Sequence, residues 1–113
     1  MLIRSQNKKR LIDIQGKVIG IEQRSDREFW MYAAGENSGA KLGAYFTEEK
    51  AIKVLDMLQK AYAEYEMLRG MSTGMGGIMV TYNTKMIVNE LEKEIQEKTI
   101  FQMPEDSEVE VND

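Results

Sequence analysis

The sequence contains no cysteine and no histidine among its 113 residues, and only one proline. Without cysteine the chain has no disulfide and no thiolate chemistry. Without histidine it lacks the commonest general base and the commonest transition-metal ligand, so Asp, Glu, Lys and Tyr would have to move every proton in a reaction. These absences predict a protein that is not an enzyme and that holds no cofactor or metal.

Long apolar runs are missing as well. No stretch approaches the roughly 20 apolar residues that a membrane-spanning helix needs, and the opening residues MLIRSQNKKR lack the apolar centre of a signal peptide. We therefore expect a cytoplasmic protein without membrane contact. Hydrophobic residues make up 42% and charged residues 30% of the chain, which is typical of a globular protein of one domain.

The formal net charge is −4, and the charges are unevenly distributed. Residues 1–30 carry seven basic and four acidic side chains, whereas the final PEDSEVEVND carries five acidic side chains and no basic one. A nearly neutral chain with an acidic end is not typical of nucleic-acid-binding proteins. We expect a protein partner and consider nucleic acid unfavoured. The cluster Lys8-Lys9-Arg10 is interpreted as a solvated turn, with phosphate contact as the alternative.

The first half of the chain has the pattern of β-strands. Short runs at 2–6, 11–14, 17–24, 27–34 and 40–46 are separated by polar turns. This arrangement predicts an antiparallel sheet of about five strands. In the last run we expect one face to consist of Leu42, Ala44 and Phe46.

The run at 27–34 has two different faces. Phe29, Met31 and Ala33 share one face, and Trp30 and Tyr32 share the other. If the Phe29 face lies in the core, Trp30 is a candidate binding anchor. The alternative is that a second helix or a neighbouring subunit covers Trp30.

A helical period begins at Thr47, which is a typical N-cap residue followed by acidic residues in the first turn. The predicted helix, 47–69, has one apolar face that packs along the sheet. Its far end, near Tyr65 and Leu68, extends beyond what such a sheet covers, so we expect a dimer. A shorter helix is predicted at 84–98 and a short strand at 99–103. The fold class is α+β: one long helix on a sheet, plus a second helix.

The stretch MLRGMSTGMGGIM at 67–79 has methionines four residues apart and four glycines. A metal-binding methionine ladder would need a helix, which four glycines oppose. A phosphate-binding loop lacks the Gly-Lys-Ser/Thr ending. We interpret the stretch as a flexible hinge at about 70–82 in which Gly70 ends the long helix. Met71 and Met75 are then adaptable apolar contacts, available to a partner.

The only proline, Pro104, marks the end of the predicted domain, which covers residues 1–104. The acidic tail, 105–113, is expected to be loosely ordered. A partner could bind its carboxylates, and the predicted interaction surface therefore consists of Trp30, Tyr32, Met71, Met75, Glu105, Asp106 and Glu108.

Three segments carry a resemblance: the N-terminal RSQ strand, the helix entry GAYFTEEKA and the FQMP strand with its acidic end. In this order they resemble a group of small uncharacterised proteins of Gram-positive bacteria, their plasmids and their phages. The resemblance covers about half of the chain. It implies a mobile-element context and a cytoplasmic location, and it carries no activity. It also suggests that the two terminal strands, LIRSQ and TIFQM, lie together.

These observations favour a small interaction or adaptor protein of a mobile element. One alternative is a phage-type inhibitor of a host nucleic-acid enzyme or defence system that acts through its acidic surfaces. Another is a weak nucleic-acid binder that uses the basic N-terminal strands. The identity of the partner and the biological process do not follow from the sequence.

Overall fold

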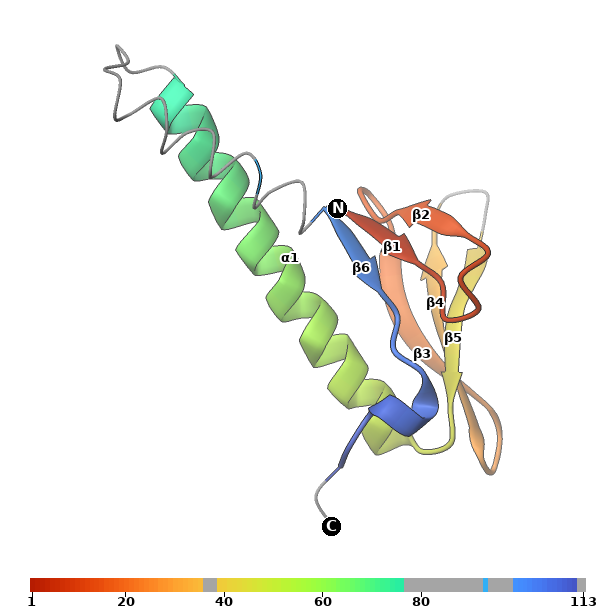
Figure 1. The fold of residues 1–113 in the computed structure, drawn as a ribbon. Helices are drawn as coiled ribbons and strands as arrows, with labels where there is room; N and C mark the ends of the chain where they lie inside the picture. The colour runs from red at the N-terminus through yellow and green to blue at the C-terminus, as the bar shows by residue number, and fades with distance from the viewer. Residues whose placement is uncertain (36–38, 77–92, 94–98, 112–113) are drawn as a thin grey trace.

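The structure is a computed structural model that describes residues 1–35, 39–76, 93 and 99–111. Its elements, in chain order, are β1 (Leu2–Arg4), β2 (Leu11–Asp13), β3 (Val18–Ser25), β4 (Glu28–Ala34), β5 (Gly39–Tyr45), α1 (Glu48–Gly76), β6 (Ile100–Gln102) and the short 3-10 helix η1 (Asp106–Glu108). The fold is α+β, as the sequence predicts (Figure 1).

The strands form two sheets, so the prediction of one sheet of about five strands is wrong. One sheet has the order β2-β1-β6, and the other is the antiparallel meander β3-β4-β5. The chain passes between them at the turn after Ile14, where Gly16 has a φ of 73°. Strand alternation cannot show this break, because it marks which residues form strands and not which strands pair.

The two ends of the described chain meet in the smaller sheet. β1 pairs with β2 in antiparallel fashion and with β6 in parallel, with Ile3 beside both Ile12 and Phe101. The expectation that the two terminal strands lie together is therefore confirmed. The parallel direction requires a long connection between the two strands, and α1 is part of it.

Gln6 joins the two sheets. Its backbone N–H donates to Leu42 O (2.7 Å), and its side-chain amide both accepts from Ala44 N and donates to Ala44 O, each at 3.0 Å. The side chain thus pairs with the free edge of β5 as a strand residue would. Gly43 allows this approach, because a Cβ there would lie 3.1 Å from the Cβ of Gln6.

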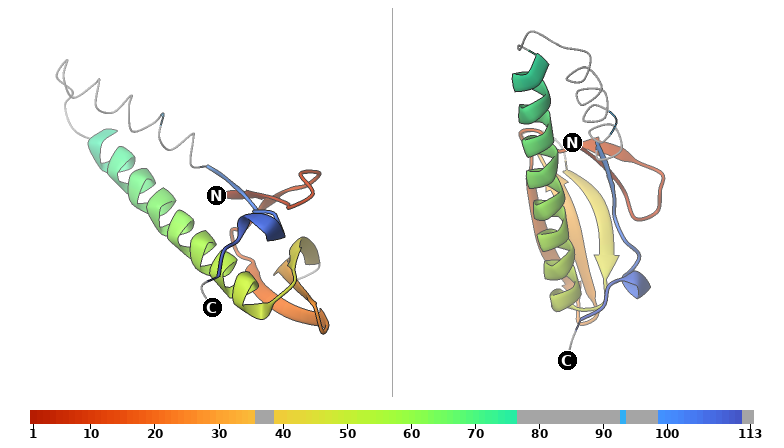
Figure 2. Two further views of the ribbon diagram at one scale, coloured as in Figure 1. Left: turned by 60° about the horizontal axis from the view of Figure 1, so that its bottom comes forward. Right: turned by 60° about the vertical axis from the view of Figure 1, so that its left-hand side comes forward.

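α1 lies across one side of β3-β4-β5, and the core fills the space between them (Figure 2). Phe29, Met31 and Ala33 are buried in this core, as predicted for that face of β4. The predicted N-cap is confirmed, since the Lys50 N–H donates to Thr47 Oγ1 at 3.2 Å. The remaining core residues come from both sheets, the helix and the C-terminal segment: Ile3, Ile12, Leu42, Tyr45, Ala51, Val54, Leu58, Met103 and Val109.

The predicted face of β5 is wrong. Leu42 and Tyr45 are buried, whereas Phe46 is 62% exposed and Ala44 is only half-buried. The pairing of β4 with β5 shifts by one residue between Met31 and Tyr32, which leaves Leu42 as an extra residue. Such a bulge reverses the alternation of side chains downstream of it, and the sequence pattern alone does not reveal it.

The long helix does not end at Gly70. α1 continues to Gly76, and Gly70 lacks the positive φ that a helix-ending glycine adopts. The first part of the predicted hinge is therefore helical. A glycine inside a helix costs only about 1 kcal/mol relative to alanine, which tertiary packing can offset. The rest of the hinge and the second helix predicted at 84–98 lie outside the described residues, apart from Lys93.

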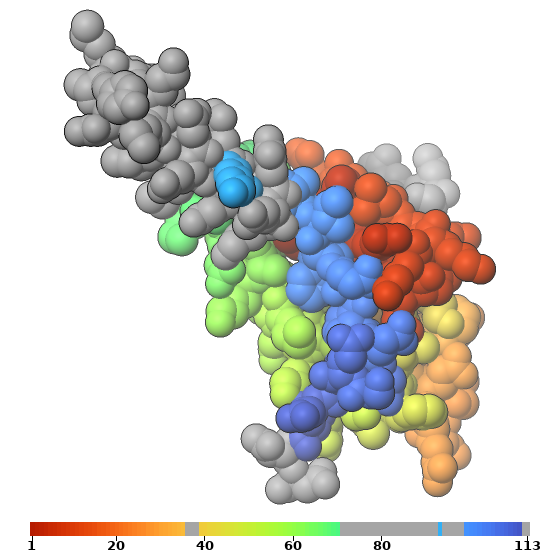
Figure 3. All heavy atoms as spheres, viewed as in Figure 1, coloured from red at the N-terminus to blue at the C-terminus, as the bar shows by residue number. Residues whose placement is uncertain are grey.

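The acidic C-terminal segment is attached to the domain up to residue 111, so the expectation of loose order is wrong for residues 105–111. The segment forms η1, and Val109 is only 4% exposed. In the space-filling view it lies against the start of α1 and the end of β5 (Figure 3). Two lysines near the start of α1 account for this, because Lys50 and Lys53 donate to Asp106 and to the carbonyl oxygen of Glu110.

Candidate functional site

The three segments that carry the resemblance meet in space through hydrogen bonds. Pro104 O accepts from Tyr45 Oη (2.8 Å) and from Gln6 Nε2 (3.1 Å). Ser5, which is buried, accepts from the Arg10 N–H at 3.1 Å and closes the β1–β2 turn. Each of these groups is used to connect strands. The residues of RSQ, GAY and MP therefore connect strands of the fold through these hydrogen bonds.

Tyr45 is the described residue whose proton affinity is clearly altered. Burial raises the pKa of its phenol well above the usual value, and the negative charges of Glu105, Asp106 and Glu108 raise this pKa further. The phenol is therefore neutral at physiological pH and donates to Pro104 O. A general base would need a lowered pKa instead, so Tyr45 acts as a structural donor.

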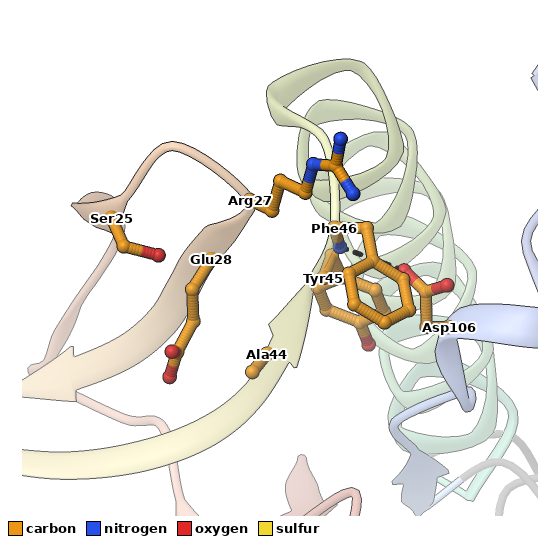
Figure 4. A pocket seen from close by; sticks show the side chains of 7 residues that line it. All are labelled: Ser25, Arg27, Glu28, Ala44, Tyr45, Phe46 and Asp106. Atoms are coloured by element: carbon orange, nitrogen blue, oxygen red, sulfur yellow. Dashed lines mark hydrogen bonds between the residues drawn. The ribbon is translucent and has the colours of Figure 1, made fainter.

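A cleft of about 390 Å³ opens next to Tyr45, between the β3–β4 turn, the end of β5 and η1 (Figure 4). Most of its polar groups are already paired. Asp106 Oδ1 accepts from the Phe46 N–H at 2.8 Å, and Asp106 Oδ2 pairs with Lys50 Nζ at 3.0 Å. Glu28, on the opposite wall, accepts from the Trp30 indole. Arg27 and the exposed ring of Phe46 complete the lining.

The edge of β3 lies beside an apolar groove. Among the described residues β3 pairs with β4 alone, and it has eight residues. The groove has a volume of about 330 Å³ and runs between β3 and α1. Its lining is apolar apart from Gln59: Ile14, Ile19, Leu55, Leu58, Gln59 and Tyr62.

The outer face of β4, opposite α1, carries Trp30 and Tyr32. Arg24 from β3 and Lys41 from β5 both lie over the Trp30 ring, at 4.2 and 3.9 Å from its centroid. Tyr32 lies across Gly20, since a Cβ at Gly20 would be 2.6 Å from the Tyr32 hydroxyl. The sequence predicts that Trp30 and Tyr32 share this face. It does not predict that Arg24 and Lys41 lie over the indole, because these residues reach it only through the pairing of β3 and β5 with β4.

A second groove, of about 340 Å³, separates the Trp30 face from the β1–β2 turn. Arg10, Asn7 and Lys41 line it together with Trp30. Further basic residues of the turn, Arg4, Lys8 and Lys9, lie around a neighbouring hollow. Among the described residues, none of these five cations forms an ion pair with a carboxylate. Arg4 instead donates to Lys8 O, and Lys8 adopts a φ of 65° within the turn.

The predicted interaction residues lie in three separate places. Trp30 and Tyr32 are on the outer face of β4, and Met71 and Met75 lie in the last turns of α1. Glu105, Asp106 and Glu108 belong to the attached C-terminal segment. Asp106 is bound within the chain, and Glu105 and Glu108 form a capping box around η1. The structure thus groups Trp30 and Tyr32 but does not bring the three sets together.

No family model matches this sequence, and searches of curated proteins and of solved structures found no match. Within the described residues, no three Asp or Glu side chains are grouped so that they could hold a metal ion. The same part of the chain contains no helix that is both long and apolar enough to cross a membrane.

Proposed function

We propose that this chain is a non-catalytic interaction module, of the mobile-element kind that the sequence resemblance suggests, and that it self-associates through β3. The observation that carries the proposal is that the edge strands of the two sheets differ in length and in how far their edges are covered. β2 and β6 are only three residues long, and the Gln6 side chain already hydrogen-bonds to the outer edge of β5. β3 offers eight residues of edge, without proline, next to an apolar groove. Long open edges are sites of strand addition.

The core beneath β3 is incomplete within the described part of the chain. Met31 of β4 is 0% exposed, whereas Ile19 and Ile21, which point to the same side from β3, are only partly buried. A strand added at this edge would extend the sheet toward the groove and would remove the apolar side chain of Ile21 from water. Each such burial contributes roughly 25 cal/mol per Å² of apolar surface.

A second copy of the chain supplies a matching strand. In an antiparallel pair of β3 strands centred on Gln23, residues 21–25 of the two copies pair, and Glu22 of each copy lies opposite Arg24 of the other. These side chains, at 55% and 46% exposure, now pair within one strand at 3.3 Å, and Arg24 also lies over the Trp30 ring. Opposite charges placed directly across two strands stabilise the pair. The two grooves then lie on one side of a continuous six-stranded sheet.

Light scattering after size-exclusion chromatography tests this proposal. We expect twice the chain mass of 13.0 kDa at about 100 µM protein. Tyr62→Glu places a charge in the groove and should give a single-chain mass. Met57→Glu is the matched control, because Met57 is also 41% exposed on α1 but does not line the groove. The proposal fails if the wild type has the single-chain mass.

Cross-linking provides a second measurement that does not depend on weakening the dimer. The chain has no cysteine, so Gln23→Cys introduces one thiol near the expected two-fold axis. Directly opposite residues have Cβ atoms about 5 Å apart, and mild oxidation should give a disulfide-linked dimer. Lys9→Cys, in the exposed β1–β2 turn, should give no disulfide-linked dimer under the same conditions.

The alternative of an inhibitor acting through acidic surfaces has less support. Its acidic tail is largely used by the fold, since Asp106 binds Lys50 and the Phe46 N–H. Glu105 and Glu108 also form a capping box in η1, in which the side chain of each accepts from the backbone N–H of the other. A nucleic-acid mimic needs carboxylates that are free to face a basic partner.

A further inference from the structure

The outer face of β3-β4-β5 provides two aromatic rings on one strand. Trp30 and Tyr32 are two residues apart on β4, which places them about 6.6 Å from each other along the strand. The Tyr32 ring lies over Gly20, as its hydroxyl and Cζ would be 2.6 and 2.8 Å from a Cβ there. One side of this ring therefore rests on the sheet, and the ring forms part of the outer surface.

Cations lie around these rings, together with the Glu28 carboxylate that accepts from the Trp30 indole. Lys41 is the β5 neighbour of Tyr32 and also lies 3.9 Å from the Trp30 ring centroid. Arg10 and Asn7 face Trp30 and Lys41 across the groove of about 340 Å³. Arg4, Lys8 and Lys9 continue the positive charge around the β1–β2 turn. Among the described residues no carboxylate forms an ion pair with Lys41, Arg10 or these three side chains.

We propose that this face binds single-stranded nucleic acid, with bases on Trp30 and Tyr32 and phosphates on Lys41 and Arg10. Aromatic rings combined with a basic groove are the usual elements of sequence-tolerant single-strand binding. The ring spacing is about twice the 3.4 Å rise per nucleotide of a stacked strand, which suits bases that are splayed onto separate rings. A poly-glutamate peptide would use the cations but has no ring that could stack on Trp30 or Tyr32.

This proposal is argued from a different face than self-association through β3, and the two share only Arg24, which lies over Trp30 and also stands at the proposed β3 contact. The sequence alone disfavours nucleic acid, because the net charge is negative and Lys8-Lys9-Arg10 has no aromatic residue beside it. The fold changes this expectation by bringing Trp30 and Lys41, which are distant in sequence, to the turn that contains Arg10.

Fluorescence measures this binding directly, because Trp30 is the only tryptophan. Titration with a 20-nucleotide oligo(dT) or oligo(U) at about 50 mM salt should quench the Trp30 emission with a micromolar Kd. The slope of log K against log salt should be about −0.7 for each phosphate contacted. Lys41→Glu should weaken binding roughly tenfold, and Tyr32→Leu should weaken it by a similar factor. Lys60→Glu makes the same charge change on the exposed side of α1 and should have little effect.

Several results would overturn the proposal. Absence of binding at about 50 mM salt would do so, and so would equal losses for Lys41→Glu and Lys60→Glu. A duplex of the same length that binds as tightly as the single strand would contradict base stacking on the rings. A poly-glutamate peptide that quenches Trp30 with equal affinity would assign the face to an acidic protein partner instead. Circular dichroism melting of each variant establishes that the compared proteins are folded.

Discussion

Gln6 and Tyr45 show how single polar residues hold this fold together. The Gln6 side chain makes two hydrogen bonds to the backbone of Ala44 and a third to Pro104 O. Tyr45 places its ring in the core and its hydroxyl on the same carbonyl oxygen. The face predicted for this strand, Leu42, Ala44 and Phe46, leaves out Tyr45, which is buried. Neither role can be predicted without knowing which strands are neighbours.

Tyr45 makes stability sensitive to alkaline pH. Because its pKa is raised in the folded state, its contribution is fully present below the unfolded pKa of 10.0 and is lost as pH rises above that value. We expect the free energy of unfolding of the wild type to fall more steeply between about pH 9.5 and 11.5 than that of Tyr45→Phe. Urea unfolding at several pH values measures both slopes, and equal slopes would contradict the role of this phenol.

At pH 8 the same variant should be less stable by about 1 kcal/mol, because one hydrogen bond to Pro104 O is lost. Gln6 Nε2 remains on that oxygen, so the oxygen keeps a partner and the loss stays moderate. Tyr62→Phe is a suitable control, since Tyr62 is also on the structured part of the chain but is 41% exposed.

Among the elements, α1 was the most predictable at its start and the least predictable at its end. The apolar period and the Thr47 cap are local signals, and both are confirmed by burial of Ala51, Val54 and Leu58 and by the cap hydrogen bond. The end of α1 cannot be predicted from the local sequence, because glycine destabilises a helix but does not prevent it. The strands of the meander were found for the same local reason, but the bulge in β5 depends on its pairing with β4.

Gly70→Ala distinguishes a helical glycine from a hinge. No described heavy atom outside its own helical backbone lies within 4 Å of where a Cβ at Gly70 would stand, and its φ is not positive. Alanine should therefore raise the free energy of unfolding by up to about 1 kcal/mol. Thermal or urea unfolding followed by circular dichroism provides the measurement. A helix that ended at Gly70 in a left-handed residue would be destabilised by the same substitution.

Gly16→Ala is the matched control for that experiment. The space around Gly16 is also empty, but its φ is 73°. Alanine in this conformation is strained by roughly 1–2 kcal/mol, so the two substitutions should change stability in opposite directions. The sign of each effect then reports backbone conformation and not crowding.

For the whole molecule, the division into two sheets and the attachment of the C-terminal segment were not predictable. The acidic composition of residues 105–111 suggests a solvated tail, yet Lys50 and Lys53 lie on the side of α1 that this segment reaches. Lys50 and Asp106 are 56 residues apart, so their attraction cannot be recognised from the local sequence around either residue. The α+β class and the pairing of the terminal strands LIRSQ and TIFQM were both expected from the sequence, and the structure has both.

Asp106→Ala tests how strongly this segment is attached. The change removes the acceptor of the Phe46 N–H and leaves the partly buried Lys50 ammonium without its carboxylate. We expect a loss of about 1–3 kcal/mol in the free energy of unfolding. Glu110→Ala should be nearly neutral, because Lys53 binds the backbone carbonyl of Glu110. Equal stability of the two variants would show that Asp106 does not anchor the segment.

The parallel neighbour of β1 also has a consequence for the time course of folding. β1 and β2 pair over a separation of fewer than a dozen residues, so this hairpin can form rapidly. The contact between the N-terminal and C-terminal segments, such as that of Gln6 with Pro104, joins residues 98 positions apart. Closing so large a loop is entropically costly and slow. The nascent chain therefore completes its smaller sheet last, after residues 100–104 have been synthesised. Until that moment one side of β1 is an open template to which other chains can attach.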